Sequence, residues 1–415
     1  MINKYLSSWY IMDKLNKHKL TSGIYPFLKK HIKRGDFSFN SVLMPHPIKD
    51  TKSKKNRLNI VIPSLRKSNV FGGINTALNF FDSLITATHF DGRIIINEKE
   101  SFDKNLTIDT SKYEKKGIKI QFLNDDTNIP ISKNDYFIFT TWKSAFVFNK
   151  VVDWQEKTYL KDFYSIYLIQ DYEPGFVAWS TEFALAESTY KINTERIIAV
   201  FNSKELYDYF KFNNYKFFKE YFFRPNLNLN LKKYLLNLEK LPKREKMIIV
   251  YGRPNAPRNA FELLKESLNQ WSSNYAKASE WKILSIGAPN TNIKLKNNIL
   301  ECKGKLTLKE YSNLMTKAYA GISLMISPHP SYPPLEMSTY GVKTITNDFM
   351  NKHMDNFNSN LYSVSPCLPE TISEKLIEIC ESYDGKGAPD LNEEYLNGND
   401  FKKVTIHVSQ DLLNM

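Results

Sequence analysis

Short apolar runs alternate with amphipathic stretches from residue 58 onward. After the first run, the segment "GGINTALNFFDSLITA" carries Ile74, Ala77, Leu78 and Phe81 at helical spacing. Such alternation predicts parallel strands joined by helical crossovers. The strands predicted in this first block are 58–63, 92–97, 118–123, 136–141, 165–170 and 197–202.

A second block with the same alternation begins at residue 247. Its predicted strands are 247–252, 281–287, 298–304, 321–327 and 342–347, and its predicted helices are 260–271, 307–320 and 370–383. Between the blocks, an aromatic and basic run from residue 203 passes into polar, lysine-rich sequence up to about 246, which we interpret as a linker. The fold class is therefore α/β, with two doubly wound Rossmann-like domains facing across a cleft. Ligands of such sheets bind beyond the carboxyl ends of the strands.

This pattern gives four segments. We expect a basic N-terminal extension at 1–57, a first Rossmann-like domain at 58–240 and a second at 241–390. The remaining segment, 391–415, is expected to pack back on the N-terminal domain. A length of 415 residues agrees with two domains.

The three cysteines are Cys302, Cys367 and Cys380, too few and too scattered for a disulfide framework or a zinc site. No run of about 18 apolar residues is present, as a membrane-spanning helix would need. The first 19 residues mix charges among the apolar positions and lack the apolar core of a signal peptide. We therefore expect a cytoplasmic protein.

The net charge of +13 is unevenly spread, because residues 1–57 hold 13 Lys and Arg against three Asp, which gives 13 − 3 = +10. A basic arm of this kind binds nucleic acid, binds an anionic membrane surface, or has no specific partner. Tyr25, Leu28 and Ile32 share one helical face within it. That pattern is typical of a short interfacial helix and equally of a helix packed on its own domain.

The stretch "ISPHPSYPPLEMSTYG" (326–341) concentrates four prolines ahead of one carboxylate. Proline suits the first helical turn, so we predict a helix that begins at Pro333 or Pro334 and ends at Gly341. Glu336 would lie in its first turn, where the helix dipole favours an anion. Glu336 then either only stabilises the start of the helix or binds a ligand.

Three further loops follow predicted strands of the second block. In "YGRPNAPRNAFELL", Arg253 and Arg258 precede a helix, and guanidinium groups beside a helix N-terminus suit a diphosphate. Two surface arginines would give the same pattern. Gly287 in "SIGAPN" allows close backbone approach to a ligand, and "CKGKLTLKEY" places Lys305 and Leu306 before the next helix.

The first block offers fewer candidates. Gly72 and Gly73 follow the first strand and leave backbone N–H groups free for a phosphate or a sugar, although turns also use Gly-Gly. Gln170, Asp171 and Glu173 cluster at the carboxyl end of another strand, as ligands or as solvated loop residues.

Trp142 follows the predicted strand 136–141 and either faces a sugar or simply packs. The acidic run 124–126 has the wrong pattern for a metal-binding Asp-x-Asp motif.

The order "GR…R", "IG.P", "G.LT..EY…A", then "S……P.LE…YG" resembles the nucleotide-sugar half of GT-B glycosyltransferases of family 4. The resemblance implies that Arg253 and Arg258 hold the donor diphosphate, with Arg258 in place of a lysine. It also implies that Glu336, the second acid of an E-x7-E pattern, binds the ribose. The first acid of that pattern is replaced by Pro328.

The segment "HPSYPPLEM", together with "VFGGINTAL" and "IQDYEPGFVAWS", resembles the WsaF-type rhamnosyltransferases of bacterial surface-glycan assembly. That resemblance covers roughly residues 58–350. It implies a retaining enzyme that takes L-rhamnose from dTDP-L-rhamnose. Asp171 is then the candidate carboxylate of the sugar subsite, and Tyr332 is expected to contact the donor.

No metal or other cofactor is expected, because the arginines and helix ends would neutralise the diphosphate. The expected partners are a nucleotide-sugar donor, a lipid-linked glycan acceptor and an anionic membrane surface. Two alternatives remain: the same fold with another donor, and a basic nucleic-acid-binding protein that uses the aromatic run 204–224. We expect no nucleic acid, because the helical spacing of Leu206, Tyr209 and Phe210 favours a core element over a stacking platform.

Overall fold

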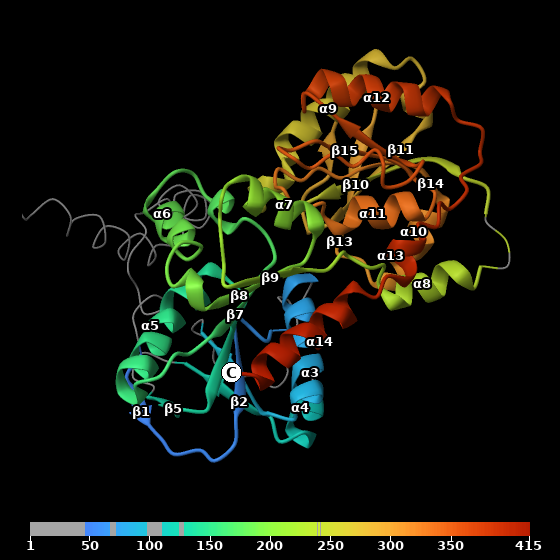
Figure 1. Cartoon of the computed structure of the whole chain (residues 1–415). Coiled ribbons are helices and arrows are strands. Elements are labelled where there is room, and N and C mark those ends of the chain that lie inside the picture. The colour runs from blue at the N-terminus through green and yellow to red at the C-terminus, as the bar shows by residue number, and fades with distance from the viewer. Residues whose placement is uncertain (1–45, 67–71, 98–109, 124–127, 239, 241) are drawn as a thin grey trace, which may run out of the picture. The chain divides into compact units, whose positions relative to one another are not determined.

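A computed structural model describes residues 46–66, 72–97, 110–123, 128–238, 240 and 242–415. Each half of this part of the chain is built on its own seven-stranded sheet (Figure 1). The α/β class with two Rossmann-like domains is confirmed.

The first sheet has the strand order β4-β3-β2-β6-β7-β8-β9, and all its pairs are parallel. The order reverses beside β2, as in a doubly wound sheet, so the loops after β2 and β6 border the switch point. The strands are β2 (Arg57–Ile62), β3 (Asp91–Ile96), β4 (Lys119–Phe122), β6 (Asp135–Phe139), β7 (Ser165–Ile169), β8 (Ile197–Phe201) and β9 (Lys219–Phe222). A separate parallel pair joins β1 (Ile48–Asp50) to β5 (Ile129–Ile131).

Helices and 3-10 turns connect these strands. They are α3 (Gly72–Thr88), α4 (Ser111–Lys115), α5 (Trp142–Tyr159), η2 (Glu173–Phe176), α6 (Thr181–Ser188), η3 (Thr194–Arg196) and α7 (Lys204–Phe212). The two faces of the sheet carry two separate cores. In β2, Ile60 and Ile62 belong to one core and Val61 to the other, because side chains alternate along a strand.

The second sheet repeats the plan with the order β12-β13-β11-β10-β14-β15-β16, in which only β12 runs antiparallel. Its strands are β10 (Glu245–Gly252), β11 (Lys282–Gly287), β12 (Ile293–Lys294), β13 (Ile299–Gly304), β14 (Ala318–Ile322), β15 (Lys343–Asn347) and β16 (Leu361–Val364). The order reverses beside β10, so the loops after β10 and β14 border the switch point of this half.

The helices of the second half are α8 (Leu229–Leu236), η4 (Pro257–Asn259), α9 (Phe261–Asn274), η5 (Ala278–Glu280), α10 (Leu308–Lys317), α11 (Tyr332–Thr339), α12 (Pro369–Glu381), α13 (Glu393–Asn397) and α14 (Asp400–Leu413). The predicted helices at 260–271, 307–320 and 370–383 are confirmed to within three residues at each end. The helix predicted at Pro333 or Pro334 is also present, although it begins at Tyr332.

One predicted strand is wrong. The apolar run 321–327 does not form the strand by itself, because α10 ends at Lys317 and β14 occupies 318–322. The rest of the run is a buried loop whose backbone groups bond elsewhere. Met325 N–H donates to Asn347 Oδ1 (2.7 Å), and Ile326 N–H donates to the Arg258 carbonyl oxygen (2.7 Å). This loop is thereby tied to the loop of the arginines.

Within 203–246, the core element expected from the helical spacing of Leu206 and Phe210 is confirmed. Residues 204–222 contain α7 and β9 of the first half, and Leu206 and Phe210 are fully buried. The linker interpretation is wrong for this part, and the lysine-rich sequence after it contains α8. Leu231 of α8 is buried in the second core together with Leu235. Leucines at a spacing of four residues in otherwise polar sequence were the available signal.

The C-terminal helix α14 packs against α3 and β9 of the first half (Figure 1, red against blue). Its residues Val404, Val408 and Leu412 lie in one core of the first half. Lys219 Nζ and the Tyr221 hydroxyl of β9 both donate to the carboxylate of Asp411, the second at 2.9 Å.

Within the described ranges, no helix combines the length and the apolar character needed to cross a membrane. The basic extension lies outside the described residues up to residue 45, including Tyr25, Leu28 and Ile32.

Candidate active site

Arg253 and Arg258 both lie in the loop after β10. Arg258 belongs to η4, and its guanidinium carbon lies 4.0 Å from the centroid of the Phe176 ring. Its Nε lies 3.7 Å from Asp171 Oδ2, so the arginine of the second half meets the predicted acid of the first. Burial lowers the pKa of Arg258, and the charge of Arg253 lowers it further. The two arginines thus lie in one loop, and the charge of each acts on the other.

Asp171 lies two residues after the end of β7 and is buried. The Ser327 hydroxyl donates to its Oδ1, and Tyr172 N–H donates to the same oxygen at 2.9 Å. Burial raises the pKa of Asp171, while Ser327, Arg258 and Lys352 oppose that rise. The carboxylate thus lies where the loop after β7 meets the loops after β10 and β14.

Glu173 begins η2 and accepts a hydrogen bond from Trp142 N–H at the first turn of α5. Burial raises the pKa of Glu173 to about 8, although that bond and the nearby cations oppose the rise. Trp142 is only 6% exposed, and its backbone is bound to Glu173. Whether its ring also meets a sugar stays a prediction.

Gly73, at the start of α3, and Gln170, after β7, are neighbours at the carboxyl edge of the first sheet. A Cβ atom on Gly73 would lie 3.2 Å from Gln170 Oε1, so the two residues are in contact. That oxygen is buried and accepts no hydrogen bond within the described part of the chain. Gly72 has φ +27°, a value that favours glycine at the start of α3.

Glu336 lies in the second turn of α11, not the first, because the helix begins at Tyr332, one residue ahead of the two prolines. Burial raises the pKa of Glu336 to about 7, and the Tyr311 hydroxyl opposes that rise. The charge of Glu336 in turn acts on five surrounding tyrosines: Tyr251, Tyr311, Tyr332, Tyr340 and Tyr395. A carboxylate in this setting is a strong hydrogen-bond acceptor for a ligand hydroxyl.

Tyr251, near the end of β10, connects three of the candidates. Burial raises its pKa, the Arg253 guanidinium opposes the rise, and Glu336 adds to it. Its ring also lies beside Gly287, where a Cβ would come within 2.9 Å of Tyr251 Cε2. Gly287 has φ +111°, so both its backbone and its neighbour require glycine.

The remaining predicted residues lie around this group. Lys305 is exposed after β13, and Leu306 packs against the core that contains Leu335 and Met337 of α11. Burial raises the pKa of Tyr332, and Thr76 and Asn202 of the first half oppose the rise.

Three buried polar residues of this region were not predicted: Ser327, His329 and Lys352. Lys352 is fully buried, donates to the Met325 carbonyl oxygen (2.6 Å), and has a pKa lowered by burial to about 8. His329 is 4% exposed. The run "HPSYPP" was a usable signal for His329, whereas nothing in the sequence around Lys352 marks it.

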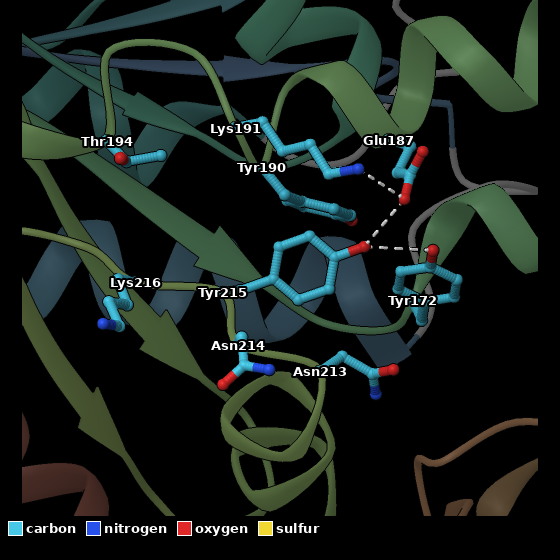
Figure 2. Close-up of a pocket in the computed structure, with 9 residues that line it drawn as sticks. All are labelled: Tyr172, Glu187, Tyr190, Lys191, Thr194, Asn213, Asn214, Tyr215 and Lys216. Atoms are coloured by element: carbon cyan, nitrogen blue, oxygen red, sulfur yellow. Dashed lines mark hydrogen bonds and ion pairs between the residues drawn. The ribbon is translucent and has the colours of Figure 1, made fainter.

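A separate pocket of about 430 Å³ lies between η3, the end of α6 and the end of α7 (Figure 2). Its polar side chains bond mainly to one another. Glu187 Oε1 accepts from Lys191 Nζ (2.9 Å) and from the Tyr215 hydroxyl (3.1 Å), which lies 3.3 Å from that of Tyr172 (Figure 2). Tyr190 donates to the Asp171 carbonyl oxygen at 3.4 Å, so this cluster supports the segment that carries Asp171.

No group of three or more His, Cys, Asp or Glu side chains suited to a metal ion occurs in the part of the chain that the structure describes. The acidic run 124–126 lies outside it.

Comparison with known protein families assigns both halves of the chain to domains of one family. Residues 57–204 match the family described as "WsaF, N-terminal domain", and residues 246–377 match "WsaF, C-terminal domain". The chain belongs to the WsaF family. It is therefore a glycosyltransferase, as the resemblance predicted.

Among curated relatives, this WsaF-family chain is similar to the "O-antigen biosynthesis protein RfbC" of Myxococcus xanthus, with 31% identity over 190 residues. The match covers 44% of this chain but only 14% of that relative, so it reaches a small part of a much longer protein.

Solved structures confirm the GT-B fold of the WsaF-family chain. Anabaena HepE, solved in complex with UDP and glucose, aligns with a TM-score of 0.56 and 11% identity, over 86% of this chain and 99% of that one. Sucrose-phosphate synthase from Thermosynechococcus elongatus aligns with a TM-score of 0.53 and 11% identity, over 86% and 95%. At these identities the likeness shows the fold alone.

Proposed function

We propose that this WsaF-family glycosyltransferase transfers a 6-deoxyhexose, L-rhamnose from dTDP-L-rhamnose, to a growing bacterial surface glycan with retention of configuration. One observation carries the proposal. Arg253, Arg258 and Glu336 gather around Tyr251 beside the switch point of the second sheet, where doubly wound sheets bind ligands.

The nucleotide-sugar donor would be held mainly through its diphosphate. Two adjacent guanidinium groups suit the oxygens of a diphosphate, and Arg258 is already positioned by Phe176 and Asp171. Glu336 would accept hydrogen bonds from the hydroxyl of the deoxyribose. No metal is needed in this scheme, because the arginines neutralise the diphosphate.

In the transfer step, the bond between the anomeric carbon and the phosphate oxygen breaks. The acceptor oxygen forms its new bond to that carbon on the same face, and its proton passes to the departing phosphate. The arginines stabilise the charge that develops on the leaving group. Asp171 would face the sugar, since its loop meets both the arginine loop and the Ser327 loop.

The acceptor is proposed from two supports. The similarity to a relative named for O-antigen biosynthesis favours a surface glycan. The +10 charge of residues 1–57 favours a lipid-linked acceptor at an anionic membrane surface on the cytoplasmic side. Removing residues 1–45 should abolish sedimentation with anionic liposomes at low salt while donor binding persists. Unchanged sedimentation would contradict the membrane role.

A thermal-shift panel of nucleotide sugars tests the donor. A ligand that binds only the folded state raises the melting temperature by mass action. We expect the largest shift with dTDP-L-rhamnose, a smaller one with dTDP, and the smallest with UDP-glucose. A larger shift with another nucleotide sugar would keep the enzyme class and replace the donor, and no shift with any of them would overturn the proposal.

A further inference from the structure

The loop between β14 and α11 holds the His329 ring in one orientation. The Ser327 hydroxyl accepts from the backbone N–H of His329 (3.1 Å) while it donates to Asp171, which fixes the loop. The ring itself is held at Nδ1, which accepts from the backbone N–H of Ser331 (2.9 Å). Ser331 has φ +69° and ψ 150°, a conformation that residues other than glycine rarely adopt. Such backbone outliers persist where the surrounding structure imposes them, commonly at ligand sites.

These bonds also fix the proton on the ring. Because Nδ1 is an acceptor, a neutral His329 carries its hydrogen on Nε2. Burial, together with the charges of Lys352 and Arg258, lowers the pKa of His329 to about 3. The ring is therefore a neutral N–H donor across the physiological pH range, and it is unsuited to act as an acid or a base there.

The Nε2–H group has no hydrogen-bond partner within the described residues, although it is buried. A buried donor without a partner destabilises the folded state, so such groups are rare unless water or a ligand satisfies them.

Its position indicates the ligand. The centroid of the His329 ring lies 5.7 Å from that of Tyr332, the first residue of the helix that carries Glu336. The charge of Arg258 also acts on the His329 ring. His329 directly follows Pro328, the position at which the E-x7-E pattern has its first carboxylate. A neutral donor between cations suits an oxygen atom of the ligand.

We propose that His329 Nε2–H donates a hydrogen bond to a hydroxyl oxygen of the transferred sugar and so contributes to the choice of sugar. The proposal rests on the proposed function. A carboxylate at position 328 would accept a hydrogen bond from a sugar hydroxyl. His329 instead presents an N–H donor. The sugar hydroxyl bound here would therefore be the acceptor, through its oxygen atom.

Calorimetry on two variants tests it. His329→Met keeps a similar size without an N–H group, and the amide nitrogen of His329→Gln approaches the place of Nε2. The Met variant should bind dTDP within twofold of the wild type but bind dTDP-L-rhamnose at least fivefold more weakly, and the Gln variant should lie between. A purely structural role would weaken both ligands equally, and that result would overturn the proposal, as would unchanged binding of both.

His407→Met is the matched control, because His407 is an exposed histidine whose ring lies 5.8 Å from that of Tyr221. It should bind both ligands as the wild type does. If the wild type itself binds neither dTDP nor dTDP-L-rhamnose, the proposed function fails. If the wild type binds them and His329→Met is unaffected, only the role of His329 fails.

A measurement on the intact protein avoids any folding defect of the variants. With 15N-labelled histidine at pH 5, where exposed histidines are charged, the His329 ring should remain neutral and protonated on Nε2, and its signal should shift with dTDP-L-rhamnose but not with dTDP. A signal that shifts with neither, or equally with both, would overturn the proposal.

Discussion

Glu336 is half-buried among tyrosines, and burial raises its pKa to about 7, so the carboxylate of the free protein is partly protonated near neutral pH. In the proposed function, the ionised carboxylate accepts a hydrogen bond from the sugar hydroxyl of the nucleotide. Donor affinity should therefore fall as the pH is lowered from 8 to 6.

We therefore expect Glu336→Gln to weaken dTDP-L-rhamnose binding by about 1–3 kcal/mol at pH 8, as for a lost charged hydrogen bond. Calorimetry at pH 6, 7 and 8 measures this. The donor has no group that titrates in that range, so the wild type should show the pH dependence and the Gln variant should not. Equal slopes in both proteins would remove Glu336 from the site.

In the proposed function, Arg253 and Arg258 stabilise the charge that develops on the leaving diphosphate, so their loss should reduce turnover. Arg253→Ala and Arg258→Ala should each reduce the release of dTDP from the donor at least tenfold, with melting temperatures close to the wild type. Lys265→Ala, on the exposed side of α9, is the control and should leave the rate unchanged. A variant with near-normal turnover would exclude that arginine from the mechanism.

At the scale of elements, the first turn of α5 depends on a group remote in sequence, because Glu173 accepts its Trp142 N–H. The Glu173 pKa is raised from 4.5 to about 8, so the neutral form is favoured by folding. Its contribution to stability is complete below pH 4.5 and is lost as the pH rises through about 8.

Glu173→Gln should accordingly be more stable than the wild type at pH 9 and close to it at pH 5. Between those limits the wild type loses at most about 1.4 kcal/mol for each pH unit through this group. Urea unfolding at both pH values measures the difference. A constant difference between the two proteins at pH 5 and pH 9 would contradict the protonation argument.

The pattern of apolar runs was sufficient to locate most of the strands, because buried parallel strands are nearly continuous apolar segments. It failed at 321–327, where an equally apolar run forms a loop stabilised by Asn347 and by the Arg258 carbonyl oxygen. Periodicity cannot reveal where backbone groups find their partners. For the same reason the contact between Asp171 and Ser327 could not be predicted, since it joins residues 156 positions apart.

At the scale of the whole molecule, the chain returns from the second half to the first through α14. Val408 is fully buried in the first core, whereas Ile406 on the same helix is 44% exposed. Val408→Ala should destabilise the protein by about 2 kcal/mol, from lost apolar burial and a residual cavity. Ile406→Ala should change stability by less than about 0.5 kcal/mol. Similar unfolding midpoints for both variants would show that α14 does not contribute to that core.

The sequence predicted two Rossmann-like halves and the loops that carry the arginines and Glu336, because both follow from local patterns. It did not reveal Lys352 or the neutral state of His329. Those depend on burial and on charges brought together from several loops, which only the folded chain specifies.

The central claim is that a nucleotide sugar binds at the loops after β10 and β14. Hydrogen–deuterium exchange with and without dTDP-L-rhamnose tests it on the unmodified protein. We expect slower exchange in residues 252–264 and 325–341, and no change in the pocket segments 187–194 and 213–216. No protection by saturating donor, or protection confined to segments outside those two loops, would contradict the account.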